Sequence, residues 1–315
     1  MTAKASSKPT VFIDGEAGTT GLQIRRRLAD VRGIEVLSIA DDKRKDEGER
    51  LELMRRADLV VLCLPDDAAK AAVGLAASLG DGAPKILDAS SAHRTAPGWV
   101  YGFSEMAADQ ASAIRSAPRV SNPGCYPTGG IALLRPLVEA GLMSRDYPVT
   151  VNAVSGYSGG GRKMIDAYDA GTAPAFELYG LGLEHKHLPE LQAYSLLDRR
   201  PIFVPSVGNF LQGMLVSVPL HLDTLPGKLS GRDLETVLEA HFAGSTQVKV
   251  LKPARGEERL DALALNDTDL LELRVFHNEK HGQAILVARL DNLGKGAAGA
   301  AVQNIQLMLG GETPL

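Results

Sequence analysis

The chain has 315 residues, of which 44% are hydrophobic, and its formal net charge is −4. This length exceeds the size at which a single hydrophobic core stops growing, so two domains are expected. The slight excess of acidic residues argues against a nucleic-acid partner, because binding through phosphates needs a clustered basic surface.

The N-terminal residues, the lengths of the apolar runs and the number of cysteines further restrict the class of protein. Residues 1–9 are polar and lack the apolar core of a signal peptide, and no run of about 18 apolar residues could span a bilayer. Only two cysteines occur, Cys63 and Cys125, so a disulfide framework is excluded. We therefore expect a cytoplasmic protein that acts on a small molecule and binds neither nucleic acid nor membrane.

The first third of the chain alternates short apolar runs with helical patterns. Strands are expected at residues 10–14, 34–39, 59–64 and 85–88, and helices at 22–30 and 68–79, with a shorter helix ending at 56. Strands that alternate with helices at this spacing predict an α/β fold with a doubly wound parallel sheet.

Beyond residue 121 the regular alternation of strands and helices ends. Strands are expected at residues 149–154, 202–205, 214–220, 270–276 and 284–290, and a glycine-rich loop at 155–163. These strands favour a second, α+β domain with a mixed or antiparallel sheet. A last helix at 300–309 has an apolar face suited to packing on the first domain. The expected domains are residues 1–120 plus 293–315, and residues 121–292.

Three glycines, Gly15, Gly18 and Gly21, separate the first strand from the first helix. This spacing lets a pyrophosphate approach the helix N-terminus, where unpaired N–H groups and the helix dipole favour anions. The strand before the glycines and the helix after them supply the context that a dinucleotide site requires. We therefore expect the first domain to bind a nicotinamide dinucleotide.

The residues after the second strand bear on the choice of cofactor. An acidic residue there binds the ribose hydroxyls of NAD, whereas a basic residue accommodates the extra phosphate of NADP. Asp41 and Asp42 precede Lys43 and Arg44. The pattern leans toward NADP without settling the choice, and a solvated run of charges is the alternative.

Cys125 follows a Pro-Gly turn and precedes the apolar run 129–142. A cysteine at the start of a helix meets the positive end of the helix dipole, which stabilises the thiolate, the form that attacks carbonyl groups. The alternative is a small residue that a tight turn requires. We expect Cys125 to be a nucleophile.

A thiolate needs a base, and His185 and His187 are the candidates. Residues two apart in an extended segment face the same way, so either ring could face Cys125, with Glu190 orienting a ring. No metal is expected, because the His-x-His pair lacks a third ligand at a familiar spacing. Arg94, Arg162 and Lys163 lie in turns or glycine-rich segments, which suggests a bound anion. Together these features predict thiolate attack on an activated acyl group and reduction of the resulting thioester by hydride.

Three segments resemble the signatures of one family. Residues 122–129 (NPGCYPTG), 185–190 (HKHLPE) and 292–304 (NLGKGAAGAAVQN) are similar to the cysteine, histidine and C-terminal motifs of the N-acetyl-γ-glutamyl-phosphate reductases, which serve arginine biosynthesis and are related to the aspartate-semialdehyde dehydrogenases. The chain resembles the short, second type of this reductase. It departs from the cysteine signature at Leu133, where a smaller residue is usual.

The resemblance implies a Rossmann-type domain, a substrate and dimerisation domain, and a homodimer or homotetramer. It also implies the NADP(H)-dependent conversion of N-acetyl-L-glutamyl 5-phosphate to N-acetyl-L-glutamate 5-semialdehyde through a thioester on Cys125. His185 is the first choice for the acid and base and His187 the second.

Contacts to the cofactor and to the substrate are expected at two sets of positions. The cofactor set is Gly15, Ala17, Gly18, Thr19, Thr20, Gly21, Ser38, Lys43, Arg44, Leu64, Pro65, Asn292, Gly294, Lys295 and Gly296. The substrate set is Ser90, Arg94, Asn122, Ser158, Gly159, Arg162, Lys163 and Glu190. The alternatives are an aspartate-semialdehyde dehydrogenase or an N-acetyl-aminoadipyl-phosphate reductase on the same scaffold, a non-catalytic NADP-binding sensor, and a cysteine hydrolase.

Overall fold

The computed structural model describes residues 8–310. The chain divides into two compact units. The first unit holds the residues up to Ser104, Asp109–Pro123 and the residues from Ala298 onward, and the second holds Glu105–Ala108 and Gly124–Ala297. Within residues 8–310, no helix is both long enough and apolar enough to cross a membrane.

The first unit is built on a six-stranded sheet. Its strands are β1 (Thr10–Asp14), β2 (Glu35–Leu37), β3 (Leu59–Leu62), β4 (Lys85–Asp88), β5 (Val100–Tyr101) and β6 (Arg119–Ser121). They lie in the order β2-β1-β3-β4-β6-β5, and each neighbouring pair is parallel. The predicted parallel α/β sheet is confirmed.

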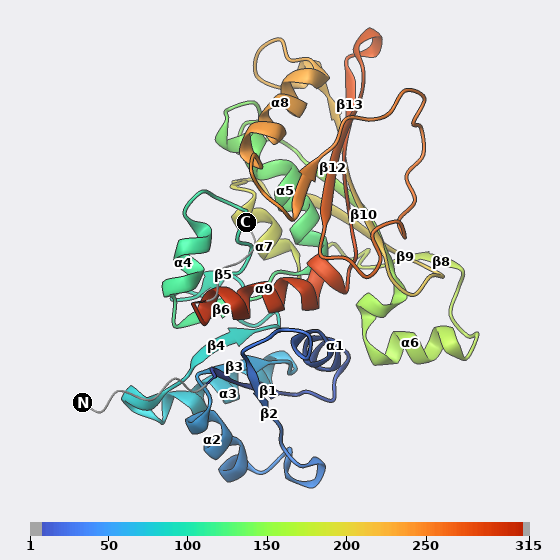
Figure 1. Ribbon diagram of the computed structural model, residues 1–315. Coiled ribbons are helices and arrows are strands. Elements are labelled where there is room, and N and C mark those ends of the chain that lie inside the picture. Colours follow the sequence, from blue (N-terminus) through green and yellow to red (C-terminus); the bar gives the residue numbers. More distant parts are fainter. Residues whose placement is uncertain (1–7, 311–315) are drawn as a thin grey trace. The chain divides into compact units, whose positions relative to one another are not determined.

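Helices cover both faces of this sheet (Figure 1). They are α1 (Thr19–Leu28), α2 (Glu47–Arg56), α3 (Asp66–Ala77), α4 (Gln110–Ser116) and α9 (Gly299–Met308). Val11 and Ile13 of β1 join a core with α1, α4 and α9, while Phe12 between them faces a second core with α2 and α3. Burial on both faces explains why these strands read as continuous apolar runs.

The second unit holds a seven-stranded sheet. Its strands are β7 (Thr150–Gly156), β8 (Phe176–Leu178), β9 (Ile202–Gly208), β10 (Met214–His221), β11 (Val248–Val250), β12 (Leu271–Asn278) and β13 (Gln283–Leu290). Their order is β11-β12-β13-β10-β7-β9-β8. The pairs β7–β9 and β11–β12 are parallel and the others antiparallel, so the predicted mixed sheet is confirmed.

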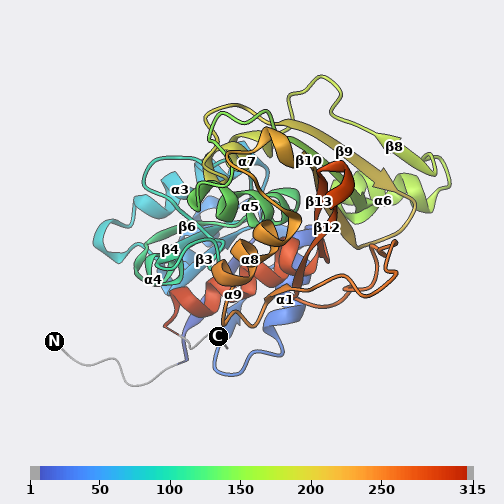
Figure 2. The ribbon, with the colours of Figure 1, turned by 90° about the horizontal axis from the view of Figure 1, so that it is seen from above.

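One face of this second sheet is covered and the other is exposed. The helices α5 (Cys125–Glu139), α7 (Leu188–Tyr194) and α8 (Gly231–His241) gather beside it, and α6 (Arg162–Asp169) lies apart from them (Figure 2). A Cβ on Gly129 would lie 2.9 Å from the Val216 side chain, so α5 approaches β10 closely. Because side chains alternate along a strand, Leu215 and Ile285 point to the opposite face, where Ile285 is 46% exposed.

Several elements differ from the sequence expectations. The short strands β5, β6, β8 and β11 were not predicted, because two or three paired residues leave no periodic pattern. The helices α4, α6, α7 and α8 were not predicted either, and α6 begins inside the expected glycine-rich loop. Residues Gly294–Ala298 form a π-helix that leads into α9. The single-turn 3₁₀ helices are Asp41–Lys43, Gly80–Gly82, Tyr157–Gly160, Leu222–Thr224 and Glu279–His281.

Candidate active site

The glycine turn between β1 and α1 has the shape that a pyrophosphate needs. Gly15 has φ +91°, and a Cβ there would lie 2.4 Å from the Cys63 carbonyl oxygen, so no other residue fits. The Gly18 N–H donates to the Gly15 carbonyl at 3.0 Å and closes the turn. Gly18 is the N-cap of α1, and no side chain of the described residues caps this helix. Its first N–H groups can therefore meet an anion, and the turn fits the expected dinucleotide.

Other predicted cofactor residues lie where neighbouring strands end. Ala17 lies in the turn, Thr19 and Thr20 begin α1, Ser38 follows β2, and Leu64 and Pro65 follow β3. The carboxyl ends of adjacent parallel strands meet at one edge of a sheet, which is where ligands of such folds bind. Lys43 and Arg44 lie further along the chain in short-range ion pairs, 3.9 Å from Asp46 and 2.6 Å from Asp41 respectively.

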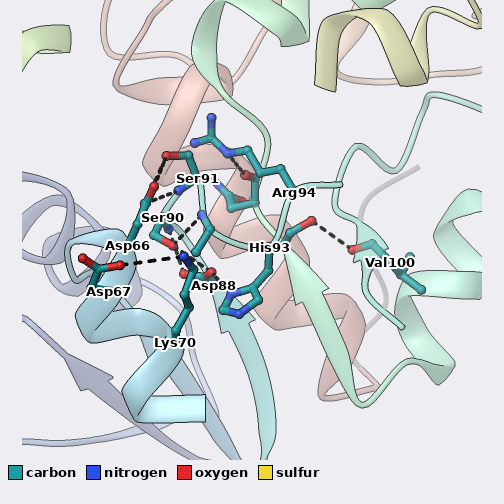
Figure 3. A network of polar contacts seen from close by, with 12 residues as sticks. Asp66, Asp67, Lys70, Asp88, Ser90, Ser91, His93, Arg94 and Val100 are labelled. Carbon is teal, nitrogen blue, oxygen red and sulfur yellow. Dashed lines mark hydrogen bonds and ion pairs between the residues drawn. The ribbon is translucent and has the colours of Figure 1, made fainter. Parts of the chain in front are cut away.

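A polar network fixes the loop after β4 (Figure 3). The buried carboxylate of Asp88 accepts hydrogen bonds from the Ser90 backbone N–H at 2.9 Å and the Ser90 hydroxyl at 2.8 Å. It also lies 2.6 Å from Nδ1 of His93, whose ring stacks on Trp99 at 4.2 Å.

The same loop carries Arg94. The Arg94 Nε donates to the Asn122 carbonyl at 3.1 Å. Ser90, Arg94 and Asn122, three predicted substrate residues, therefore lie together at the ends of β4 and β6.

Cys125 is the first residue of α5, as expected for a helix-activated thiolate, and its side chain is partly exposed. The N–H of the preceding Gly124 donates to Glu190 Oε2 at 3.0 Å, and the Glu190 side chain is buried. Thr128 Oγ1 donates to the Gly124 carbonyl at 2.9 Å. A carboxyl group from α7 thus holds the turn that presents Cys125.

The histidine motif is not the extended segment that the sequence analysis assumed. His187 is the N-cap of α7, and its φ of −86° and ψ of −9° are helical rather than extended. The His187 backbone N–H donates to His185 Nδ1 at 3.1 Å, so a neutral His185 carries its proton on Nε2. The two rings lie 4.7 Å apart, and their centroids lie 6.1 and 5.8 Å from the ring of Tyr126, the residue after Cys125.

Two tyrosines complete the surroundings of the cysteine. The Tyr126 hydroxyl donates to the Ser206 carbonyl at 3.0 Å and accepts from the Tyr179 hydroxyl at 3.1 Å. Burial raises the pKa of both phenols, and the charge of the nearby Cys125 adds to the rise. Both phenols stay neutral donors at neutral pH. Tyr179 was not predicted as a site residue, because a single aromatic residue outside any motif gives no signal in the sequence.

Residues 292–297 of the C-terminal motif belong to the second unit, as Cys125 does. A Cβ on Gly296 would lie 2.9 Å from the Cys125 Cβ, and a Cβ on Gly294 would lie 2.0 Å from the Thr268 carbonyl oxygen. Asn292 donates to Ser158 Oγ at 2.9 Å and accepts from the Gly213 N–H at 2.8 Å.

The one charged residue of the motif, Lys295, is buried. Its ammonium donates to Glu105 Oε1 and Gln247 Oε1, each at 2.7 Å. Asn292 and Lys295, two predicted cofactor residues, therefore make structural contacts within their own unit.

The remaining predicted substrate residues follow β7. Ser158 is buried beneath Asn292, and Gly159 follows it in a 3₁₀ turn. Arg162 and Lys163 begin α6, where the 83% exposed Arg162 side chain binds Asp166 at 2.9 Å. The described residues contain no cluster of three or more metal-ligating side chains.

The fold and the matched domain define a protein of the semialdehyde dehydrogenase class. Residues 125–292 match the model of the semialdehyde dehydrogenase dimerisation domain. The structure resembles that of aspartate semialdehyde dehydrogenase II from Vibrio cholerae complexed with ASA, with a TM-score of 0.72 and 15% identity over 96% of this chain and 98% of that one. It also resembles aspartate semialdehyde dehydrogenase with NADP from Candida albicans, with a TM-score of 0.63 and 14% identity over 95% and 98% of the two chains.

Curated relatives narrow this class. The N-acetyl-gamma-glutamyl-phosphate reductases of Brucella ovis and Burkholderia ambifaria are 53% and 50% identical, over 96% of this chain and 99% and 97% of their own lengths. N-acetyl-gamma-glutamyl-phosphate reductase 2 of Pseudomonas putida is 50% identical over 96% of this chain and 97% of its own length. The chain belongs to the N-acetyl-gamma-glutamyl-phosphate reductase family, which confirms the resemblance found in the sequence.

Proposed function

We propose that this protein reduces N-acetyl-L-glutamyl 5-phosphate to N-acetyl-L-glutamate 5-semialdehyde with NADPH, a step of arginine biosynthesis. The observation that carries the proposal is the position of Cys125 at the N-terminus of α5, beside Gly296, in a chain half identical to reductases of this name. The aspartyl and aminoadipyl alternatives share the chemistry and differ only in substrate.

The cysteine performs the covalent chemistry. Its proton passes to the unprotonated nitrogen of His185 or of His187, which in His185 is the Nδ1 that otherwise accepts the His187 N–H, and the thiolate attacks the acyl carbon. Phosphate leaves with the electrons of the carbon–oxygen bond, so that a thioester remains on Cys125. When the tetrahedral adduct of the reduced thioester collapses, the thiolate leaves and the aldehyde is released.

The cofactor site supplies the reducing equivalent. Bound NADPH provides the hydride, and the turn from Gly15 to Gly18 with the start of α1 would hold its pyrophosphate. The N–H groups at the start of α5 would stabilise the oxyanion that forms during attack, at about 3 kcal/mol for each donor. Ser90, Arg94 and Asn122 would contact the substrate, with Ser158, Gly159, Arg162 and Lys163. Glu190 would act through the turn before Cys125.

The exposed face of the second sheet would form an interface with another copy of the chain. Phe176, Leu178, Ile202 and Ile285 are 57%, 49%, 53% and 46% exposed, and a symmetric dimer buries the same patch on both subunits. The match to a dimerisation domain supports an assembly of identical subunits, for which we propose a homodimer or homotetramer. We also propose that the protein is cytoplasmic.

Three variants test the assignment. Cys125→Ser should abolish turnover while the dissociation constant for NADPH stays unchanged, and even a tenth of the activity would remove Cys125 as the nucleophile. His185→Asn and His187→Asn should differ in kcat, because only the loss of the histidine that acts as acid and base should lower it. A change in KM alone would assign that histidine to substrate binding.

A further inference from the structure

Arg25 is held between the two segments that a bound dinucleotide would follow in the first unit. It lies on α1, about two helical turns after Gly18, the N-cap of the helix. Its Nη1 donates to Glu16 Oε2 in the glycine turn at 2.5 Å and to the hydroxyl of Ser38, the residue after β2. The guanidinium therefore spans the gap between the pyrophosphate turn and the end of β2.

In doubly wound sheets, the end of the second strand is part of the dinucleotide site. The adenosine ribose of a dinucleotide lies at the end of the second strand, and the residues there distinguish a 2′-hydroxyl from a 2′-phosphate. β2 pairs in parallel with β1, with Leu37 opposite Phe12, so Ser38 stands at that end. A guanidinium bound to Ser38 brings its charge to the ribose position.

The orientation of Arg25 suits a phosphate. Both contacts use the same nitrogen, Nη1, so the second terminal nitrogen can meet an incoming phosphate oxygen. The side chain is 43% exposed, which leaves it open to a ligand, whereas Glu16 is only 11% exposed and fixes it from the inner side. Planar guanidinium groups with one edge already held are suited to charge-assisted bonds with phosphate.

The basic residues that the sequence favoured lack this connection. Arg44 binds Asp41, three residues away, and the Asp41 side chain is 88% exposed. Lys43 lies 3.9 Å from Asp46, also three residues away, and both side chains are about half exposed. Exposed pairs at this spacing are weak and local, so they do not place a charge at the end of β2.

We propose that Arg25, oriented by Glu16 and Ser38, binds the 2′-phosphate of NADP and sets the preference for NADP over NAD. The inference rests on the proposed function, because it assumes that the first unit binds a nicotinamide dinucleotide. It assigns to Arg25 the role that Lys43 and Arg44 had in the sequence analysis.

The test measures binding of adenosine 2′,5′-bisphosphate and of ADP by calorimetry, without turnover. Arg25→Gln should weaken the bisphosphate about 10-fold to 100-fold, the effect of one charge-assisted bond, and change ADP less than about 2-fold. Arg26→Gln, which removes the same charge from an exposed site on the same helix, is the matched control and should change neither. A melting curve checks that each variant is folded.

Each other result overturns the inference. Loss of bisphosphate affinity in Arg44→Gln but not in Arg25→Gln would return the role to the residues after β2. If the wild-type protein binds neither compound and also fails to bind NADPH, the proposed cofactor fails as well. If Arg25→Gln prefers adenosine 2′,5′-bisphosphate over ADP as strongly as the wild type does, only the role of Arg25 is refuted.

Discussion

Removing the Glu190 carboxyl should lower kcat, because it disturbs the turn that presents Cys125, and should leave the binding of NADPH unchanged. Glu190 is 1% exposed and accepts the Gly124 N–H at 3.0 Å, directly before the nucleophile. In Glu190→Ala this buried N–H loses its acceptor, which costs about 1–3 kcal/mol. We expect the hydrogen bond to Glu190 to hold the turn most strongly in the transition state, so that its loss raises the activation free energy by this amount. The value of kcat then falls by about 5-fold to about 160-fold, at 1.36 kcal/mol per factor of ten.

The assay follows NADPH with saturating substrate, together with thermal unfolding. Glu190→Gln keeps an acceptor oxygen and should recover most of the loss. Glu184→Ala is the control, because Glu184 is 84% exposed and pairs with Arg200 at 2.9 Å, so that kcat should stay within about 2-fold. Wild-type kcat and melting temperature in Glu190→Ala would refute the positioning role, and a rise in KM alone would show that Glu190 binds substrate.

Two further predictions concern the cysteines and a partly buried ion-pair cluster around Glu272. Burial, with Asp88 and Asp14 nearby, raises the pKa of Cys63 to about 12, so Cys63 stays a thiol at neutral pH. Iodoacetamide should therefore modify Cys125 first, as mass spectrometry would show, and earlier modification of Cys63 would contradict this. Burial raises the pKa of Glu272, but hydrogen bonds from Arg274 and Arg289 outweigh it and leave the pKa lowered. The stability that Glu272 provides is then present above its unfolded pKa of about 4.3 and lost as pH falls through the folded value. The difference in unfolding free energy between wild type and Glu272→Gln should shrink from pH 7 toward acid, and a constant difference would refute the linkage.

The fold was largely predictable where the chain fixes its own backbone. Strands such as β1 and β3 are buried on both faces and so show as apolar runs. Gly15 was recognised from the spacing of three glycines between a strand and a helix, and the structure gives the reason for a glycine there, because its φ and its approach to Cys63 allow no side chain. The strands β8 and β11, with three residues each, depend on their neighbours and gave no signal.

The site was predictable in its motifs but not in its long-range contacts. Glu190 and Gly124 are 66 residues apart in the chain, and only the folded unit shows that one holds the other. The two histidines were assigned to an extended segment, whereas the N-terminus of α7 sets their geometry. Lys43 and Arg44 stood out by charge alone, while the link from Arg25 to Ser38 depends on how α1 packs beside β2.

The reverse reaction tests the central claim most directly. Purified protein is incubated with NADP, inorganic phosphate and either N-acetylglutamate semialdehyde or aspartate semialdehyde, and the absorbance of NADPH is followed. We predict phosphate-dependent formation of NADPH with the acetylated aldehyde only. Turnover with aspartate semialdehyde alone, or with neither aldehyde, would contradict the proposed function.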